Sequence, residues 1–399
     1  MGGVSMEWKE CQIQDVCRLI NGRAYSNDEM LEHGKYKIVR VGNLSGGNST
    51  WFYSDLELPE DKYCHNGDLL FAWACTFGPH IWKEDNTIFH YHIWKIVEDK
   101  DVVDRRFFYY YLKYATGGFL GALNGSVMVH ITKSSMEKMN IRIPKNLEDQ
   151  HRIASILSSL DRKIELNNKI NADLEEMAQA IFKNWFVDFE PFKDGKFVDS
   201  ELGMIPEGWK VGRLTDVIKL MPGGTPKTSE PLYWDNGTIP FFSPKDVSGV
   251  YCFETEKHIT EAGLNKCSSN LYPKDTIFIT CRGTVGKVCL TACDMAMNQS
   301  NYAIKAIDGY SQYYVYYLVK SVVERLIKKS NGAVFSAITS KDFDEEILIP
   351  SQKTVEDFTN VIDSFFRRIF TLGTENSRLS TLRDTLLPRL MSGEIEVPE

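Results

Sequence analysis

The sequence predicts an α+β protein in which a mixed α/β globule occurs twice, and each copy is followed by a long helix. Three observations support this fold class: a recurring string, further matches in the same order, and an apolar stripe that ends each half. The string is NGSVMVHIT at residues 124–132 and NGAVFSAIT at residues 331–339, 207 positions later. A unit of this length is far longer than a solenoid repeat of roughly 20–50 residues. The pattern therefore indicates a duplicated domain.

Further matches extend the repeat along both halves of the chain. The matched segments, in order, are Trp8-Lys9 with Trp209-Lys210, 67–71 with 274–278, 109–112 with 315–318, and Ile143-Pro144 with Ile349-Pro350. Their offset stays between 201 and 207 positions. Because the matches keep both order and spacing, chance similarity does not account for them.

The first part of each half predicts a mixed α/β globule. Short β-rich segments alternate there with Gly, Pro and Asn turns. These segments include residues 36–41, 68–73, 88–96, 276–280 and 302–307.

A long helix is predicted at the end of each half. Apolar residues recur there every three or four positions, from Ile153 to Trp185 and from Phe358 to Leu390. The first stripe covers 33 residues, or roughly 50 Å at about 1.5 Å per residue. Such a stripe needs a partner, so we expect the two helices to pack on each other; packing of each stripe on its own globule is the alternative. Gly373 is expected to kink or fray the second helix. The residues expected to pack are Ile153, Leu157, Leu160, Ile164, Leu174, Met177, Ile181, Val361, Phe365, Ile369, Leu379 and Leu386.

These patterns divide the chain into five segments. The first globule is expected at residues 1–147 and its helix at 148–187. A charged linker follows at 188–200. The second globule is expected at 201–350 and its helix at 351–399.

Charge and hydropathy exclude several classes of protein. The net charge is −8, and residues 1–147 hold 17 basic and 18 acidic side chains, against 16 and 17 in residues 201–350. Neither globule is basic overall, which argues against non-specific coating of nucleic acid. No apolar run reaches the roughly 18–20 residues of a membrane helix, and the start MGGVSMEW lacks the pattern of a signal peptide. We therefore expect a cytoplasmic protein.

No enzyme motif is complete. The segment 223–228, GGTPKT, resembles a phosphate-binding loop, but Pro226 replaces the glycine that precedes the lysine. His90 and His92 share one face of a strand, with no third metal ligand suggested nearby. We therefore expect no catalytic residue, no bound metal and no cofactor in this chain.

Polar, glycine-rich loops between strands are the candidates for a binding surface. Four cations lie on these loops in the second half: Lys227, Lys245, Arg282 and Lys287. Arg282 with Thr284 suits guanine edges or phosphates, and Asn298 with Gln299 suits adenine edges or a turn. An ordinary turn or a solvated surface is the alternative for each of them. In the first half, Cys75-Thr76-Phe77 stand where the second has Arg282-Gly283-Thr284, so the two copies diverge at this place.

Several strings together resemble the specificity subunit of type I restriction–modification systems. They are the Trp-Lys start, Gly-Gly-Thr-Pro at 223–226, Arg-Gly-Thr-Val-Gly at 282–286, Asn298-Gln299, IFKNWFVDF at 181–189 and LPRLMSGEI at 387–395. The resemblance covers almost the whole chain. Tyr91 departs from it, because the family often has glutamine at this position, as the second half does at Gln299.

The resemblance implies a function for the repeated architecture. Each globule would be a target recognition domain for double-stranded DNA, and the two helices would pack antiparallel as a spacer. The target would be bipartite and asymmetric, with one half-site for each domain. Two modification subunits would bind the chain and methylate adenine with S-adenosylmethionine, and restriction or translocase subunits can join them. The candidate DNA contacts are Lys227, Lys245, Arg282, Thr284, Lys287, Asn298, Gln299, Arg40, Thr76 and His80. The rival hypothesis is an adaptor that holds proteins together without recognising DNA.

Overall fold

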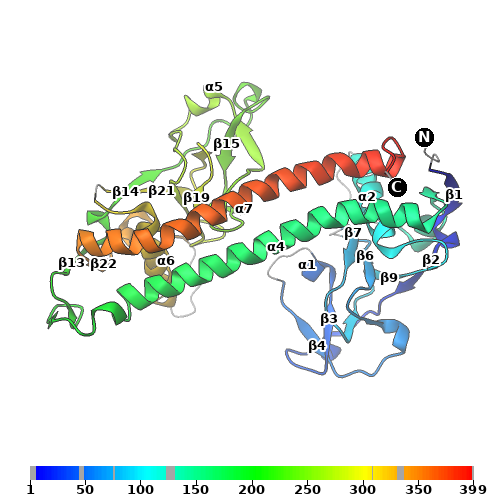
Figure 1. Cartoon of the computed structure of the whole chain (residues 1–399), viewed down its shortest axis with the longest axis horizontal. Helices are drawn as coiled ribbons and strands as arrows, with labels where there is room; N and C mark the ends of the chain where they lie inside the picture. Colours follow the sequence, from blue (N-terminus) through cyan, green and yellow to red (C-terminus); the bar gives the residue numbers. More distant parts are fainter. Residues whose placement is uncertain are drawn as a thin grey trace. The chain divides into compact units, whose positions relative to one another are not determined.

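The computed structural model describes residues 6–44, 49–74, 77–122, 131–307, 309–329 and 337–397. Most of the recurring string, at 124–130 and 331–336, lies outside these residues. The chain forms two compact units: residues 1–162 with 379–399, and residues 163–378. The two units are described separately below (Figure 1).

The first unit is built on an antiparallel sheet of order β2-β9-β6-β7. Its strands are β2 (Cys17–Asn21), β9 (Ile93–Glu98), β6 (Leu69–Ala72) and β7 (Gly78–Ile81). Helix α2 (Arg105–Ala122) packs on this sheet, and its buried Phe107 and Phe108 share a core with Leu19, Phe71 and Ile96. A second sheet has the order β4-β3-β8-β5. The remaining elements are β4 (Phe52–Ser54), β3 (Tyr36–Val39), β8 (Thr87–Phe89), β5 (Tyr63–Cys64), the pair β1 (Trp8–Gln12) and β10 (Asn140–Pro144), α1 (Val41–Leu44) and α3 (Lys133–Glu137).

The second unit contains a five-stranded sheet of order β14-β21-β18-β19-β16. Its strands are β14 (Ile218–Pro222), β21 (Asn301–Ala306), β18 (Ile277–Thr280), β19 (Val288–Thr291) and β16 (Tyr251–Cys252). Helix α6 (Gln312–Lys329) packs on this sheet through Val315 and Val319, which share a core with Ile277 and Ile304. A smaller sheet has the order β17-β15-β20. The remaining elements are β17 (Lys257–Ile259), β15 (Ile239–Phe242), β20 (Ala296–Met297), the pairs β13 (Lys210–Arg213) with β22 (Glu346–Ile349) and β11 (Phe197–Val198) with β12 (Ile205–Pro206), and α5 (Glu261–Leu264).

The strand orders confirm the duplication. The series β2-β9-β6-β7 returns as β14-β21-β18-β19, and the pair β1–β10 returns as β13–β22. Single hydrogen bonds also recur: the Gly22 N–H donates to the Ile93 carbonyl at 3.1 Å, and the Gly223 N–H donates to the Asn301 carbonyl at 3.3 Å. The two copies therefore share their backbone register.

The two long helices, α4 (Leu147–Phe186) and α7 (Gln352–Ser392), run antiparallel in contact with each other. In the first unit, the Arg383 Nη1 donates to the Asp161 Oδ1 at 2.7 Å. In the second unit, the Asn167 Nδ2 donates to the Asn376 Oδ1 at 2.9 Å. Early residues of α4 thus contact late residues of α7, and later residues of α4 contact earlier residues of α7. This confirms the predicted antiparallel packing. Helix α4 also packs on the globules: its Ile153 lies in the core of the first unit, and its Phe182 contacts Tyr317 of α6 in the second.

Burial differs along the predicted stripe. Ile153, Leu157 and Ile369 are buried. Met177 and Val361 are 51% and 43% exposed, because the buried positions beside them are Ala178 and Ile362. The half-buried residues of the stripe are Leu160, Ile164, Leu174, Ile181, Phe365, Leu379 and Leu386.

Gly373 does not fray helix α7, contrary to that part of the expectation, since the helix continues from Gln352 to Ser392. A Cβ atom on Gly373 would lie 2.2 Å from the ring of Phe253. The glycine therefore makes room for an aromatic side chain of the second globule.

Candidate nucleic-acid interface

Four strands of the second unit meet at one edge of their sheet. Strands β14 and β18 end there, and β21 and β19 begin there, because neighbouring strands are antiparallel. The Cys281 N–H donates to the Ser300 carbonyl at 2.9 Å, and the Asn298 N–H donates to the Phe242 carbonyl, at the end of β15, at 3.0 Å. The loops 223–228, 243–247, 281–287 and 298–300 therefore lie together. We call these loops the second-domain edge.

Close backbone contact holds two of these loops together. A Cβ atom on Gly223 would lie only 2.0 Å from the Asn298 carbonyl oxygen, so glycine is required there. The Thr225 hydroxyl donates to the Gln299 Oε1. Loop 223–228, which carries Lys227, is thus fixed against loop 298–300.

The predicted cations of the second-domain edge point to solvent. Lys227, Lys245, Arg282 and Lys287 are all exposed. Within the described ranges, none of the four side chains has an ion pair or a hydrogen bond. They are available to phosphates or base edges.

A tight hairpin between β18 and β19 presents Arg282 and Thr284. Gly283 and Gly286 have φ angles of +77° and +85°, which favour glycine. The Thr280 hydroxyl donates to the Thr284 carbonyl, and it accepts from the Lys287 N–H at 3.0 Å. The loop backbone is therefore hydrogen-bonded internally, while both side chains are exposed.

The two predicted amides have different surroundings. The Asn298 Oδ1 accepts from the Ser300 N–H at 3.0 Å and from the Asn301 Nδ2 at 2.6 Å, so it stabilises a turn. Gln299 is exposed, and its Oε1 accepts from Thr225. Gln299 is therefore better placed than Asn298 to reach a ligand.

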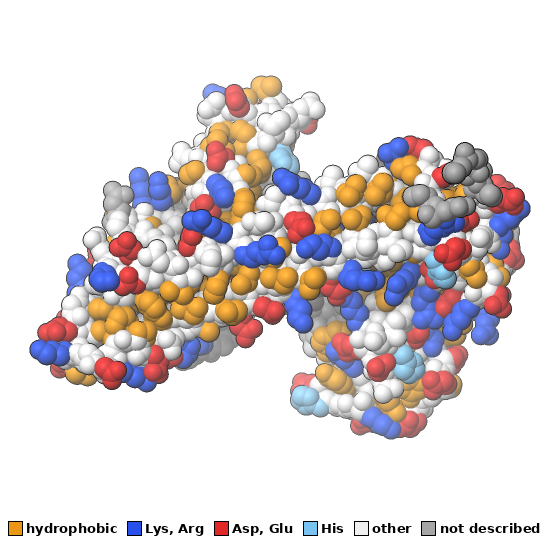
Figure 2. Space-filling model, viewed as in Figure 1, with side chains coloured by type: hydrophobic (Ala, Val, Ile, Leu, Met, Phe, Trp, Pro, Cys, Tyr) orange, Lys and Arg blue, Asp and Glu red, His pale blue; other side chains and the backbone are white. Residues whose placement is uncertain are grey.

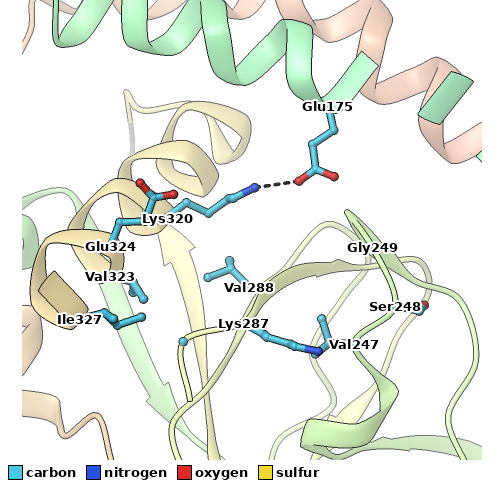
Figure 3. Close-up of a pocket in the computed structure, with 11 residues that line it drawn as sticks. Glu175, Val247, Ser248, Gly249, Lys287, Val288, Lys320, Val323, Glu324 and Ile327 are labelled. Carbon is cyan, nitrogen blue, oxygen red and sulfur yellow. Dashed lines mark hydrogen bonds and ion pairs between the residues drawn. The ribbon is translucent and has the colours of Figure 1, made fainter. Parts of the chain in front are cut away.

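Lys287 also lines a cavity of about 400 Å³ beside the second-domain edge. Figure 3 shows the segment 247–249 and helix α6 around it. Across the cavity, the Lys320 Nζ lies 2.7 Å from the Glu175 Oε1, and a dashed line marks this ion pair. Lys320 is thereby neutralised, which leaves Lys287 as the lining cation without a carboxylate partner in the described part of the chain.

The first unit has an equivalent edge. Strands β2 and β6 end there and β9 begins there, so the segments 22–23, 73–74 and 90–92 lie together; we call them the first-domain edge. A Cβ atom on Gly22 would lie 2.2 Å from the His90 carbonyl oxygen, as at Gly223. The Trp73 N–H donates to the His92 carbonyl at 3.1 Å, which matches the bond from Cys281 to Ser300.

This hydrogen-bond register corrects one detail of the sequence alignment. If Trp73 is equivalent to Cys281, then Ala74 is equivalent to Arg282. The sequence comparison places Cys75 opposite Arg282, one residue too far, because strands β6 and β18 are themselves related by 208 positions, as Leu69 and Ile277 show. Cys75 and the predicted contact Thr76 lie outside the described residues.

Aromatic rings dominate the first-domain edge. The Tyr91 ring lies 3.8 Å from the His92 ring, and the Trp73 ring lies 5.0 Å from the same imidazole, between ring centroids. The Trp73 Nε1 donates to the Tyr91 carbonyl at 2.9 Å. Burial, followed by His92 and Arg40, lowers the pKa of His90 to about 4, and burial lowers the pKa of His92. Both imidazoles are therefore neutral at physiological pH.

The two guanidinium groups near the first-domain edge are engaged within the chain. Arg23 forms a bidentate pair with Glu29 at 2.6 and 2.9 Å. The predicted contact Arg40 donates to the Thr50 carbonyl at 3.2 Å and lies 4.4 Å from the centre of the Phe52 ring. The predicted contact His80 lies within strand β7, opposite Leu70, and not at the edge.

Sequence reasoning did not select Trp73, Arg23 or Thr225. The repeat contained a signal for two of them, because Gly22-Arg23 and Gly223-Gly224-Thr225 follow corresponding strands. The position of Trp73 at the first-domain edge follows only from the hydrogen-bond register of the strands.

Comparison with known proteins identifies the family. A family model described as the type I restriction modification DNA specificity domain matches residues 6–176 and, again, residues 206–376. The chain belongs to this family. It is 30% identical, over 310 residues, to the type I restriction enzyme MjaIX specificity subunit of Methanocaldococcus jannaschii, covering 75% of this chain and 71% of that protein. It is 26% identical to the HindI specificity subunit of Haemophilus influenzae, covering 98% of this chain and 100% of that protein.

A solved structure has the same fold. The crystal structure of the type I restriction–modification S subunit from M. genitalium aligns with a TM-score of 0.56 at 16% identity, covering 99% of this chain and 97% of that one. The family assignment supports a function in DNA sequence specificity and does not favour the adaptor hypothesis. None of the described helices is both long and apolar enough to cross a membrane. Within the described residues, no three His, Cys, Asp or Glu side chains form a metal-binding group.

Proposed function

We propose that this specificity subunit recognises an asymmetric bipartite DNA target, with one half-site for each recognition domain. The observation that carries the proposal is the pair of equivalent edges. Both are built on the same strands and the same close glycine contact, yet one presents Arg282 and Gln299 where the other presents Ala74 and Tyr91. A shared scaffold with different side chains is suited to recognising two different half-sites.

Each segment predicted from the sequence has a role in this proposed function. Residues 1–147 and 201–350 are the recognition domains, and 148–187 and 351–399 are the spacer helices, joined by the linker 188–200. Helix α4 has 40 residues, or roughly 60 Å at about 1.5 Å per residue. B-DNA repeats every ~34–36 Å, so the helix length sets how many base pairs between the half-sites are not recognised.

The chemistry belongs to partner subunits. Two modification subunits bind the chain and methylate adenine with S-adenosylmethionine, and restriction subunits cut unmodified DNA. The chain itself holds no cofactor and is not catalytic. One supporting observation is that Gly223 and Gly224 are packed against Asn298 and Ser268, so this glycine loop is filled by the chain's own atoms. Because the substrate is chromosomal DNA, the complex works in the cytoplasm.

The test is a map of methylated adenines in the host genome, with and without the gene. We expect deletion to abolish methylation at one motif with two unlike half-sites and a gap of fixed length. Loss of no motif, or loss of a single uninterrupted motif, would contradict the proposal. A deletion strain complemented with the intact gene is the control.

A further inference from the structure

Building on the proposed function, we propose that the first recognition domain identifies at least one A·T pair of its half-site by contact between Tyr91, supported by Trp73 and His92, and the thymine methyl group. The second domain relies on Arg282, whose counterpart in the first domain is Ala74. The two half-sites are therefore distinguished by different chemistry as well as by different sequence.

The aromatic group is exposed and held in place. The Tyr91 side chain is 40% exposed, and its ring packs on His92 with 3.8 Å between centroids. Trp73 stacks on the buried Trp94, with centroids 5.9 Å apart and planes 22° apart. The Trp73 Nε1 is committed to the Tyr91 carbonyl, so the indole contributes an apolar surface and no free donor. The Tyr91 and Trp73 rings thus present a fixed apolar surface beside solvent, and the His92 imidazole contacts both of them.

The surroundings disfavour recognition of guanine. Guanine is most often recognised by a bidentate Arg or Lys. Among the described residues of this edge, Arg23 is committed to Glu29, and Ala74 occupies the place of Arg282. Nearby Arg40 donates one hydrogen bond to the Thr50 carbonyl and lies over the Phe52 ring. Neither of these guanidinium groups stands where Arg282 stands in the second domain.

A thymine methyl group matches the aromatic side chains that the first-domain edge presents. In the major groove, the C5 methyl distinguishes thymine, and proteins recognise it by apolar contact. A phenol ring with apolar neighbours supplies such a contact without a net charge. The neutral imidazole of His92 can also accept or donate one hydrogen bond to the paired adenine.

The experiment uses the complete complex, purified from its host through a tag on this chain, and duplexes that carry the mapped target. Each thymine of each half-site is replaced in turn by deoxyuridine, which lacks only the C5 methyl. We expect at least one replacement in the first half-site to weaken binding about 4-fold, the value of one buried methyl group. That sensitivity should disappear in the Tyr91→Ala complex. Tyr114→Ala, which removes a 37% exposed aromatic from α2, should retain it.

A second variant guards against a folding defect in the first. Tyr91→Gln introduces the residue type found at the equivalent position 299 and should also lose the response to deoxyuridine. If no thymine of the first half-site responds while both half-sites remain specific, this inference fails and the proposed function stands. Equal weakening of every duplex by Tyr91→Ala would also overturn it, because that result indicates a backbone contact. Absence of sequence preference at both half-sites would instead refute the proposed function.

Discussion

Arg282 illustrates how a single residue acquires a role from its loop. It is exposed on a hairpin, and the Thr280 hydroxyl and two glycines hold the backbone of that hairpin in place. No described carboxylate neutralises Arg282. Loss of such a side chain should therefore change recognition and leave the fold intact.

The Arg282→Ala variant should lose discrimination at one half-site only. A bidentate arginine contributes about 1–3 kcal/mol of base discrimination, so we expect the affinity for the cognate second half-site to fall by that amount. Substitutions in the first half-site should keep their wild-type effect. Binding of the complex to singly substituted duplexes measures both. Lys305→Ala, which removes an exposed cation within strand β21, is the control. Equal loss at both half-sites would contradict the assignment.

His90 makes the first domain sensitive to acid. Its pKa is lowered by burial to about 4, against 6.5 for a free imidazole. An unfolded chain takes up this proton near pH 6.5, whereas the folded chain does so only near pH 4. The free energy of unfolding therefore falls as the pH drops from 6.5 towards 4, and it is unaffected by this group above 6.5.

Replacement of His90 by glutamine should reduce this acid sensitivity. We expect the urea midpoint of His90→Gln to fall less between pH 7.5 and pH 5 than the wild-type midpoint. His92, whose pKa is also lowered by burial, remains in both proteins. His33→Gln, at an exposed histidine of the same unit, should keep the wild-type difference. Identical pH dependence in all three proteins would show that burial of His90 has no energetic effect.

At the scale of elements, the long helix α7 contains a glycine for a packing reason. Gly373 lies opposite the ring of Phe253, which is itself packed between Tyr251 and Phe370. Helix propensity alone favours alanine over glycine by about 1 kcal/mol. The contact with Phe253 should outweigh that preference.

Two helical glycines should thus respond to alanine in opposite directions. Gly373→Ala should lower the free energy of unfolding by about 1 kcal/mol, because overpacking costs typically 1–3 kcal/mol. Gly117→Ala in α2 should raise it by about 0.5–1 kcal/mol, since no atom lies within 4 Å of the new Cβ. Urea unfolding measures both. Stabilisation by Gly373→Ala would mean that Phe253 moves away at little cost.

The sequence was sufficient to predict the main elements of the fold, but it was insufficient to predict the side-chain contacts at the two domain edges. Repeat and periodicity predicted the duplicated globules and both long helices, because these depend on local spacing. They did not predict the state of Arg40, whose partners Thr50 and Phe52 come from another strand and its preceding loop. The sequence patterns were compatible with either a base contact or a turn at Asn298. The hydrogen bonds from Ser300 and Asn301 to its side chain favour the turn.

At the scale of the whole molecule, charge limits what the chain can bind alone. The net charge is −8, and on the face shown in Figure 2 basic and acidic side chains are interspersed. Affinity for DNA depends largely on the number of phosphates that cations neutralise. The few exposed cations of the second-domain edge supply only part of that number.

We therefore expect the isolated chain to bind DNA weakly and the assembled complex to bind it tightly. Gel-shift titrations at 50 and 200 mM salt, with and without the modification subunits, measure the difference. A duplex with both half-sites scrambled is the control. Tight, sequence-specific binding by the isolated chain would contradict this expectation.

The pairing of β1 with β10, and of β13 with β22, has a consequence for how such genes change. Trp8 lies opposite Pro144, and Lys210 lies opposite Ile349, so the chain enters and leaves each globule through adjacent hydrogen-bonded strands. A recombination event that exchanges the coding segment between two such strands would replace an entire globule and leave the helices untouched. New DNA specificities can thus arise by transfer of a whole module, without gradual change of single contacts.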